Sequence, residues 1–298
     1  MTTAVATLIC NPAAPALSDS VVARARAVLP GAAAPQWLAP AVAVDIAFAR
    51  PVGDDASVRA ALAAEVDGLP IDLHIGPADG RRKKLLVADM DSTIIAQECI
   101  DELADLVGLK DHVASITERA MRGEIAFEPA LRDRVALLRG LRATVIDDVF
   151  ATRITLTPGA RTAVRTMRAH GAYTALVSGG FTAFTARVAA MVGFDEHRAN
   201  RLLIEADAFS GRVAEPILGA RAKVDALEAL RVAHECARNE TMAVGDGAND
   251  LPMLQNAGLG VAYHAKPAVA AAAALRIDHG DLTALLYAQG YPMSAFAA

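Results

Sequence analysis

The chain has 298 residues, of which 54% are hydrophobic and 21% charged, and this length suits two domains. Its 29 Lys and Arg residues are outnumbered by 34 Asp and Glu residues, so the basic surface of a nucleic-acid-binding protein is absent. No apolar run approaches the roughly 20 residues of a membrane span, and no secretory leader pattern opens the chain. We therefore expect a cytoplasmic protein that acts on small molecules, without a membrane or nucleic-acid partner.

Residues 1–80 predict a small α+β domain. Strands are expected over residues 4–10 and 71–75, one or two strands over 37–48, and helices over 21–29 and 58–66. This β-α-β-(β)-α-β order is typical of a ferredoxin-like module and is similar to the ACT domains that sense amino acids. No ligand-binding cluster is visible in it, so a structural role, or a dimerising one that gives a homodimer, stands beside sensing. The basic residues 77–84 are expected to form a solvated linker.

Residues 81–298 predict an α/β domain with a parallel, Rossmann-like sheet. Short apolar strands are expected over residues 85–88, 173–177, 242–244, 259–262 and 275–277, with helices between them. The helical residues at about 96–156 predict a cap inserted after the first of these strands. One helix in it is marked by Ile100, Leu103, Leu106 and Val107. A β-hairpin is expected over 202–217, with Ser210 and Gly211 in its middle.

The segment Asp89-Met90-Asp91-Ser92-Thr93 directly follows the first strand of this sheet. Two aspartates in this spacing also open a calcium loop of the EF-hand type, which needs Gly at its sixth position and Glu at its twelfth. Ile94 and Ile100 occupy those positions, so the calcium loop is excluded. A simple helix cap at Asp91 or Ser92 remains the alternative for this segment alone.

Polar side chains also follow two other apolar strands. Ser178 follows the strand at 173–177, and Asp246 and Asp250 follow the strand at 242–244. Placed side by side in one sheet, these ends would crowd at least three carboxylates, which cannot all stay ionised without a cation. Such oxygen-rich sites suit Mg²⁺. The sequence therefore predicts a magnesium and phosphate site.

The chemistry of such a site suggests a role for each side chain. Asp89, at the strand end, is placed to attack phosphorus as a nucleophile. Asp91 can protonate the leaving alkoxide and later take a proton from the hydrolytic water. Ser178 and the Gly179 amide can hold phosphoryl oxygens. Lys223, near the start of a helix, can offset the negative charge on those oxygens.

These segments together resemble the four ordered motifs of the haloacid dehalogenase-like phosphohydrolases. The motifs are Asp89 to Thr93, Ser178-Gly179-Gly180-Phe181, Lys223, and Gly245-Asp246-Gly247-Ala248-Asn249-Asp250. The last two motifs and the cap resemble the phosphoserine phosphatase branch. The resemblance covers residues 83 to 290 and implies Mg²⁺-dependent hydrolysis of O-phospho-L-serine through an aspartyl-phosphate, the last step of serine biosynthesis.

The resemblance also implies site residues. Asp89, Asp246 and the Asp91 carbonyl would bind Mg²⁺, Asp250 and Gly180 would support the site, and Asn249 would contact phosphate or substrate. Met121 and Phe127 match the apolar lid of the family.

The cap supplies an independent argument about the substrate. A phosphorylated amino acid carries a carboxylate and an ammonium group, so its pocket needs one cation and one anion. Arg134 lies between Leu131 and Val135 on a helical wheel, at the edge of the buried face, and can bind a carboxylate with its forked guanidinium. Glu98, shortly after the nucleophile loop, can bind the ammonium.

Two other functions remain open. One is a phosphatase or phosphotransferase of the same fold that acts on another small phosphomonoester. The other is an amino-acid-binding regulator that has lost catalysis, against which the intact Asp89 and Asp91 pair argues.

Overall fold

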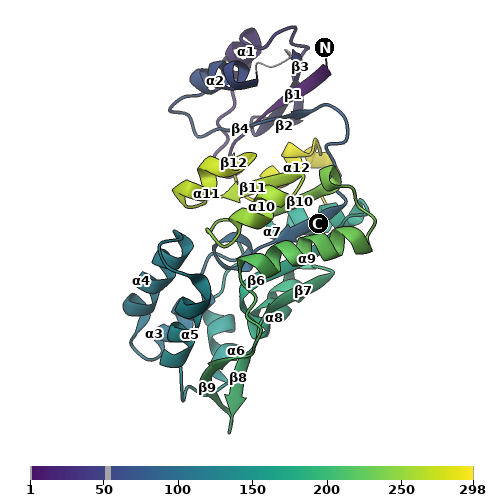
Figure 1. Ribbon diagram of the computed structural model, residues 1–298. Helices are drawn as coiled ribbons and strands as arrows, with labels where there is room; N and C mark the ends of the chain where they lie inside the picture. The colour runs from purple at the N-terminus through teal and green to yellow at the C-terminus, as the bar shows by residue number, and fades with distance from the viewer. Residues whose placement is uncertain (1, 51–54, 298) are drawn as a thin grey trace.

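The computed structural model describes residues 2–50 and 55–297, and it contains two main sheets (Figure 1). Met1, residues 51–54 and Ala298 belong to the two expected domains but lie outside the described residues. Within the described ranges, no helix is both long enough and apolar enough to cross a membrane.

The N-terminal part is a four-stranded antiparallel sheet with two helices. Its elements are β1 (Thr2–Ile9), α1 (Asp19–Ala27), β2 (Gln36–Ala39), β3 (Ala43–Arg50), α2 (Asp55–Glu65) and β4 (Asp72–Pro77). The sheet order β2-β3-β1-β4 confirms a small α+β fold of β-α-β-β-α-β order. The region expected to hold one or two strands forms two, because Ala41 takes a positive φ in the turn between them.

The second sheet has six parallel strands in the order β12-β11-β10-β5-β6-β7, with helices packed around it. Its strands are β5 (Leu85–Ala88), β6 (Tyr173–Phe181), β7 (Glu196–Asn200), β10 (Thr241–Gly245), β11 (Leu259–Tyr263) and β12 (Leu275–Ile277). Its helices are α7 (Ala160–Ala169), α8 (Thr182–Val192), α9 (Ala220–Ala233), α10 (Leu251–Asn256), α11 (Pro267–Ala272) and α12 (Ala284–Ala288). The α/β prediction is confirmed. The polar edge strand β7 was not expected, because its sequence lacks an apolar run.

Four helices are inserted between β5 and β6: α3 (Cys99–Asp105), α4 (Lys110–Met121), α5 (Phe127–Leu137) and α6 (Val145–Thr152). A bridge between Ile95 and Leu156 closes the base of this insertion, which we call the cap. One expectation about it is wrong. Leu106 and Val107 are each 39% exposed, because α3 ends at Asp105 and the chain turns before it could bury them.

The predicted hairpin exists, but its expected centre is wrong. It consists of β8 (Leu202–Glu205) and β9 (Ala208–Val213), and the turn falls at Ala206 and Asp207, which both have positive φ. Ser210 and Gly211 lie inside β9 instead. This strand packs against the cap, where the Phe209 carbonyl accepts a hydrogen bond from the Gly140 amide.

The expectation of a solvated linker after β4 is wrong for Arg81 and Lys83, although Arg82 and Lys84 are exposed. Arg81 forms an ion pair of 2.5 Å with Asp45 of β3 and donates to the Tyr287 carbonyl of α12. Lys83 is buried as well. At the start of β4, Asp72 accepts hydrogen bonds from three backbone amides, at residues 278–280. The segment therefore fastens the N-terminal sheet to the six-stranded sheet.

Candidate active site

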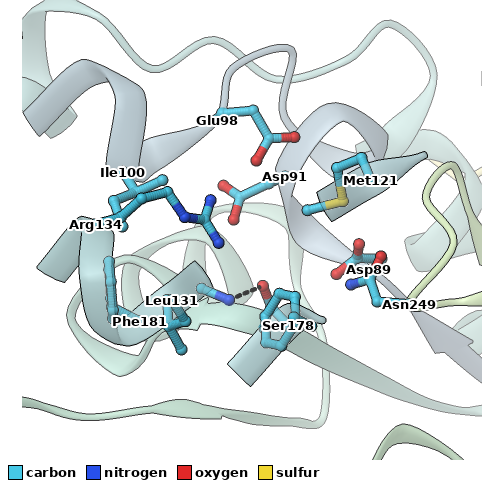
Figure 2. A pocket seen from close by; sticks show the side chains of 13 residues that line it. Asp89, Asp91, Glu98, Ile100, Met121, Leu131, Arg134, Ser178, Phe181 and Asn249 are labelled. Carbon is cyan, nitrogen blue, oxygen red and sulfur yellow. Dashed lines mark hydrogen bonds between the residues drawn. The ribbon is translucent and has the colours of Figure 1, made fainter. Parts of the chain in front are cut away.

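The site lies where β10, β5 and β6 end side by side, with the cap above them. Parallel strands bring their carboxyl ends to one edge of a sheet, which is where ligands bind in such folds. The pocket there has a volume of about 20 Å³, room for about one water molecule, so the cap is closed over it. Its walls are Asp89, Asp91, Glu98, Ile100, Met121, Phe127, Leu131, Arg134, Ser178, Gly179, Gly180, Phe181 and Asn249 (Figure 2).

The loop after β5 holds its two aspartates in different surroundings. The Asp89 carboxylate accepts a hydrogen bond of 2.8 Å from the Met90 amide and lies against Lys223. Asp91 accepts a hydrogen bond of 3.1 Å from the amide of Cys99, the first residue of α3. Burial raises the pKa of Asp91 to about 6, despite the opposing effect of this hydrogen bond. A carboxyl group with this pKa can both donate and accept a proton near neutral pH.

Lys223 is the cation at the centre of the carboxylate cluster. It is fully buried in α9, and its Nζ lies 2.7 Å from Asp89 Oδ1 and 2.6 Å from Asp250 Oδ1. Burial alone would lower the pKa of Lys223, but Asp250 and Asp89 raise it overall, so the lysine stays charged. The other Asp250 oxygen accepts from the amides of Asp246 and Gly247. Asp250 therefore anchors both Lys223 and the loop after β10.

The buried carboxylates of Asp89, Asp246 and Asp250 lie close enough together to hold a metal ion, with oxygen atoms within 4.8 Å of one another. Burial, and then the charge of Asp250, raises the pKa of Asp89 well above its usual value and that of Asp246 to about 7. The single positive charge of Lys223 does not balance three carboxylates, so the cluster has excess negative charge. Because the ligands are carboxylates, the group fits a hard divalent cation.

The carboxyl end of β6, which contains Ser178, Gly179 and Gly180, offers neutral hydrogen-bonding groups to the same pocket. Ser178 is buried, and its Oγ accepts a hydrogen bond of 2.8 Å from the Gly180 amide, the contact dashed in Figure 2. A Cβ at Gly180 would lie 2.6 Å from Asp91 Oδ2, so only glycine lets the end of β6 and the loop after β5 approach this closely. Opposite them, the buried Asn249 Oδ1 has no hydrogen-bond partner in the described structure. An unpaired buried acceptor in a pocket points to a ligand or water there.

The cap contributes a buried arginine to the pocket. Arg134 is 2% exposed, and its guanidinium donates to the Ala130 carbonyl at 3.0 Å and to Thr117 Oγ1 at 2.8 Å. Thr117 in turn donates to Asp101. No carboxylate of the described residues lies within the 4.0 Å of an ion pair with Arg134. A buried cation without a paired anion costs free energy that a bound carboxylate would recover.

Glu98 provides the opposite charge on the same side of the pocket. Figure 2 shows its carboxylate, that of Asp91 and the Arg134 guanidinium pointing toward one another. Ser92 donates a hydrogen bond of 2.7 Å to Glu98. Burial, and then the charge of Asp91, raises the pKa of Glu98 well above its usual value. An ammonium group bound there would relieve this repulsion.

The sequence of residues 86–255 matches the haloacid dehalogenase-like hydrolase family. The chain belongs to the haloacid dehalogenase-like hydrolases. A phosphoserine phosphatase of Streptomyces coelicolor is 43% identical over 235 residues, which are 78% of this chain and 57% of that protein. The chain thus spans less than two thirds of this relative's length.

Two solved structures have a similar fold. A haloacid dehalogenase family hydrolase from Salmonella enterica serovar Typhi superposes with a TM-score of 0.84 at 28% identity, over 96% of this chain and 98% of that one. A phosphoserine phosphatase described as a phospho-aspartyl intermediate analogue has a TM-score of 0.66 at 37% identity, over 69% and 98% of the two chains. The first similarity therefore includes the N-terminal sheet.

Within this haloacid dehalogenase-like fold, all the site residues expected from the sequence come together. Most line the pocket, while Lys223, Asp246 and Asp250 lie directly behind it. Thr117 and Asp101, which hold Arg134 in place, were not predicted from the sequence. Thr93 also contributes to the site, because it donates a hydrogen bond to Asp246 at 3.1 Å. Nothing in the sequence marks Thr117, because its partners are distant along the chain. Arg134 lies on α5, and Asp101 lies 16 residues before Thr117 on α3.

Proposed function

We propose that the protein hydrolyses O-phospho-L-serine to L-serine and phosphate with Mg²⁺ as cofactor. The observation that carries this proposal is the buried Arg134, which has no ion-pair partner among the described residues and faces Glu98 in the same pocket as Asp89 and Ser178. Arg134 and Glu98 match the carboxylate and ammonium of an amino acid, while the loops below match a phosphoryl group. The similarity to curated phosphoserine phosphatases supports the same substrate.

In the proposed reaction, the Asp89 carboxylate attacks phosphorus and forms an aspartyl-phosphate. Asp91 gives its proton to the departing serine oxygen and then takes a proton from the water that cleaves the aspartyl-phosphate. Ser178 and the Gly179 amide hold phosphoryl oxygens, while Lys223 orients Asp89. Mg²⁺, held by Asp89, Asp246 and the Asp91 carbonyl, would supply positive charge beside the phosphoryl oxygens. Asn249 contacts the phosphate, and Met121 and Phe127 cover the substrate.

The direct test is phosphate release from O-phospho-L-serine with and without Mg²⁺, compared with sugar phosphates, phosphoglycolate and O-phosphoethanolamine. We expect Mg²⁺-dependent turnover with a strong preference for phosphoserine. Preference for a sugar phosphate would refute phosphoserine as the substrate but would still agree with a phosphatase mechanism. No turnover of any substrate would favour a binding protein instead.

Mg²⁺ should stabilise the fold more at pH 8 than at pH 6. The pKa of Asp246 is raised from 3.8 to about 7, so between these values the metal-free folded protein holds a proton that the unfolded chain releases. The contribution of Asp246 to the free energy of unfolding therefore falls as the pH rises toward 7. Mg²⁺ competes with the Asp246 proton for the carboxylate, so Mg²⁺ binds the folded protein more tightly at pH 8 than at pH 6.

Thermal denaturation at pH 8 should show that Mg²⁺ raises the free energy of unfolding by about 2.7 kcal/mol when its free concentration is about 100 times its Kd. Asp246→Asn should remove most of the gain, and an equal gain at both pH values would contradict the cluster as the metal site.

Thr117→Val should raise KM for phosphoserine about fivefold and leave kcat nearly unchanged. The fivefold change corresponds to the loss of one hydrogen bond, which contributes roughly 1 kcal/mol. Thr117 does not line the pocket and acts by holding Arg134, so the chemical step should proceed once substrate is bound. Thr152→Val, at an exposed cap threonine, is the matched control. A fall in kcat with unchanged KM would show that Thr117 does not act through substrate binding.

A further inference from the structure

A second cavity lies between the N-terminal sheet and the six-stranded sheet. Its volume is about 420 Å³, far larger than that of the closed active-site pocket. Lys83, Asn239, Leu259 and Ala274 of its wall lie at the amino ends of β5, β10, β11 and β12. The cavity is thus at the sheet edge opposite the active site, and the two pockets share no lining residue. Clefts between domains are common positions for small-molecule sites.

Three nitrogen groups in the wall of this cavity lack adequate partners. His74 Nδ1 and Arg81 Nε are buried and have no hydrogen-bond partner in the described structure. Lys83 is 9% exposed, and its ammonium reaches only two carbonyl oxygens, of Asn239 at 2.7 Å and Gly80 at 3.5 Å. No carboxylate in the described ranges forms an ion pair with it. Buried polar nitrogen atoms without partners are rare in folded proteins, because each has lost its hydrogen bonds to water.

The charges around the cavity favour an anion. The ion pair with Asp45 balances Arg81, which leaves the Lys83 ammonium as the buried charge without a counterion. Burial, and then Arg81, lowers the pKa of His74 to about 3, so its ring is neutral and can donate one hydrogen bond without adding charge. Arg59 adds a positive charge at the exposed rim, where Asp79 is the one acidic residue of the described lining.

We propose that this cavity is a second ligand site, which binds the oxyanion group of a small molecule, a carboxylate or a phosphate, through Lys83, Arg81 and His74. Ile75, Leu259 and Ala288 line the rest of the cavity and suit a small apolar body on the ligand. Because His74 belongs to β4 and Lys83 lies two residues before β5, a bound anion joins the N-terminal sheet to the six-stranded sheet. The site thereby gives the N-terminal domain a ligand-dependent contact with β5, the strand that Asp89 directly follows.

The test follows the His74 ring by NMR in the full chain labelled with ¹⁵N-histidine, with His74→Gln to assign its resonance. Sodium sulfate, sodium phosphate and sodium acetate are titrated separately at constant ionic strength. We expect a saturable shift of the His74 Nδ1 resonance with at least one of them, and the strongest binder identifies the anionic group. Sulfate bound at Ser178 lies at the opposite sheet edge and should leave this resonance unchanged.

Lys83→Met should weaken the apparent affinity at least tenfold, whereas Lys84→Met, at the neighbouring exposed lysine paired with Glu240, should not change it. Should Lys83→Met fail to fold, Ala274→Glu places a carboxylate at an exposed position of the wall and should abolish binding, with Ala274→Gln as its neutral control. The proposal would be overturned if the shift of the His74 resonance did not saturate with any of the three anions up to about 50 mM. It would also be overturned if the shift were equal in Ala274→Glu.

Discussion

Asp89→Asn is expected to lower kcat for O-phospho-L-serine by about 10³-fold or more, because an amide cannot form the aspartyl-phosphate. The substitution keeps the size of the side chain, and Lys223 retains its contact of 2.6 Å with Asp250. The substitution also removes one of the three neighbouring carboxylates of Asp89, Asp246 and Asp250. Burial, and then repulsion by Asp250, raises the pKa of Asp89, so its charge destabilises the metal-free fold at pH 8.

Two measurements separate these effects. Steady-state kinetics should show the loss of turnover, and thermal denaturation without metal at pH 8 should show a midpoint equal to or above that of the parent protein. Asp225→Asn, at an exposed carboxylate of α9 paired with Arg221, is the control and should change neither. Turnover above about a tenth of the parent rate in Asp89→Asn would refute the assignment of Asp89 as nucleophile.

Arg134→Met is expected to raise KM for O-phospho-L-serine about 10²-fold or more. Methionine fills much of the same space, but the variant leaves the substrate carboxylate buried without a cation, which costs about 2–5 kcal/mol. O-Phosphoethanolamine has the phosphate and the ammonium but no carboxylate. Its kcat/KM should therefore change much less, so the preference for phosphoserine expected from the proposed function should largely disappear.

Arg132→Met provides the matched control on the same helix. Arg132 is exposed and pairs with Glu215 at 2.9 Å, outside the pocket, so KM for phosphoserine should stay within about twofold of the parent value. An equal loss with both substrates in Arg134→Met would mean that Arg134 supports the cap as a whole, and the carboxylate assignment would fail.

The catalytic part of the fold could be predicted because its signals are local. β5 and β10 are short, buried strands followed directly by the aspartates that they position, and β6 carries Ser178 near its own carboxyl end. Parallel strands bring such ends to one edge, so the cluster around Asp89 followed from the pattern. Arg134 could also be assigned to the pocket, because its place on the helix is fixed by Leu131 and Val135.

The wrong expectations concern residues whose environment is set by distant parts of the chain. Ser210 and Gly211 have the composition of a turn, yet they lie in β9 because the cap packs against that strand. Arg81 belongs to a basic run typical of a linker, yet it binds Asp45 and two carbonyl oxygens of α12. No local pattern indicates these partners. The same reason hides Thr117, whose role depends on Arg134 and Asp101.

The attachment of the N-terminal sheet limits how two copies of this chain can associate. The face that carries Thr7 is turned toward the other domain, since Arg81 donates both to Thr7 Oγ1 and to the Tyr287 carbonyl. In Figure 1, α1 and α2 lie on the side of this sheet away from β12, which packs beside β4. A homodimer through this domain stays a prediction, and stacking of two sheets face to face would require the domain to detach. Without detachment, the described part of this domain offers a second copy the outer edge of β2, where the sheet could be extended, and the outer surfaces of the two helices.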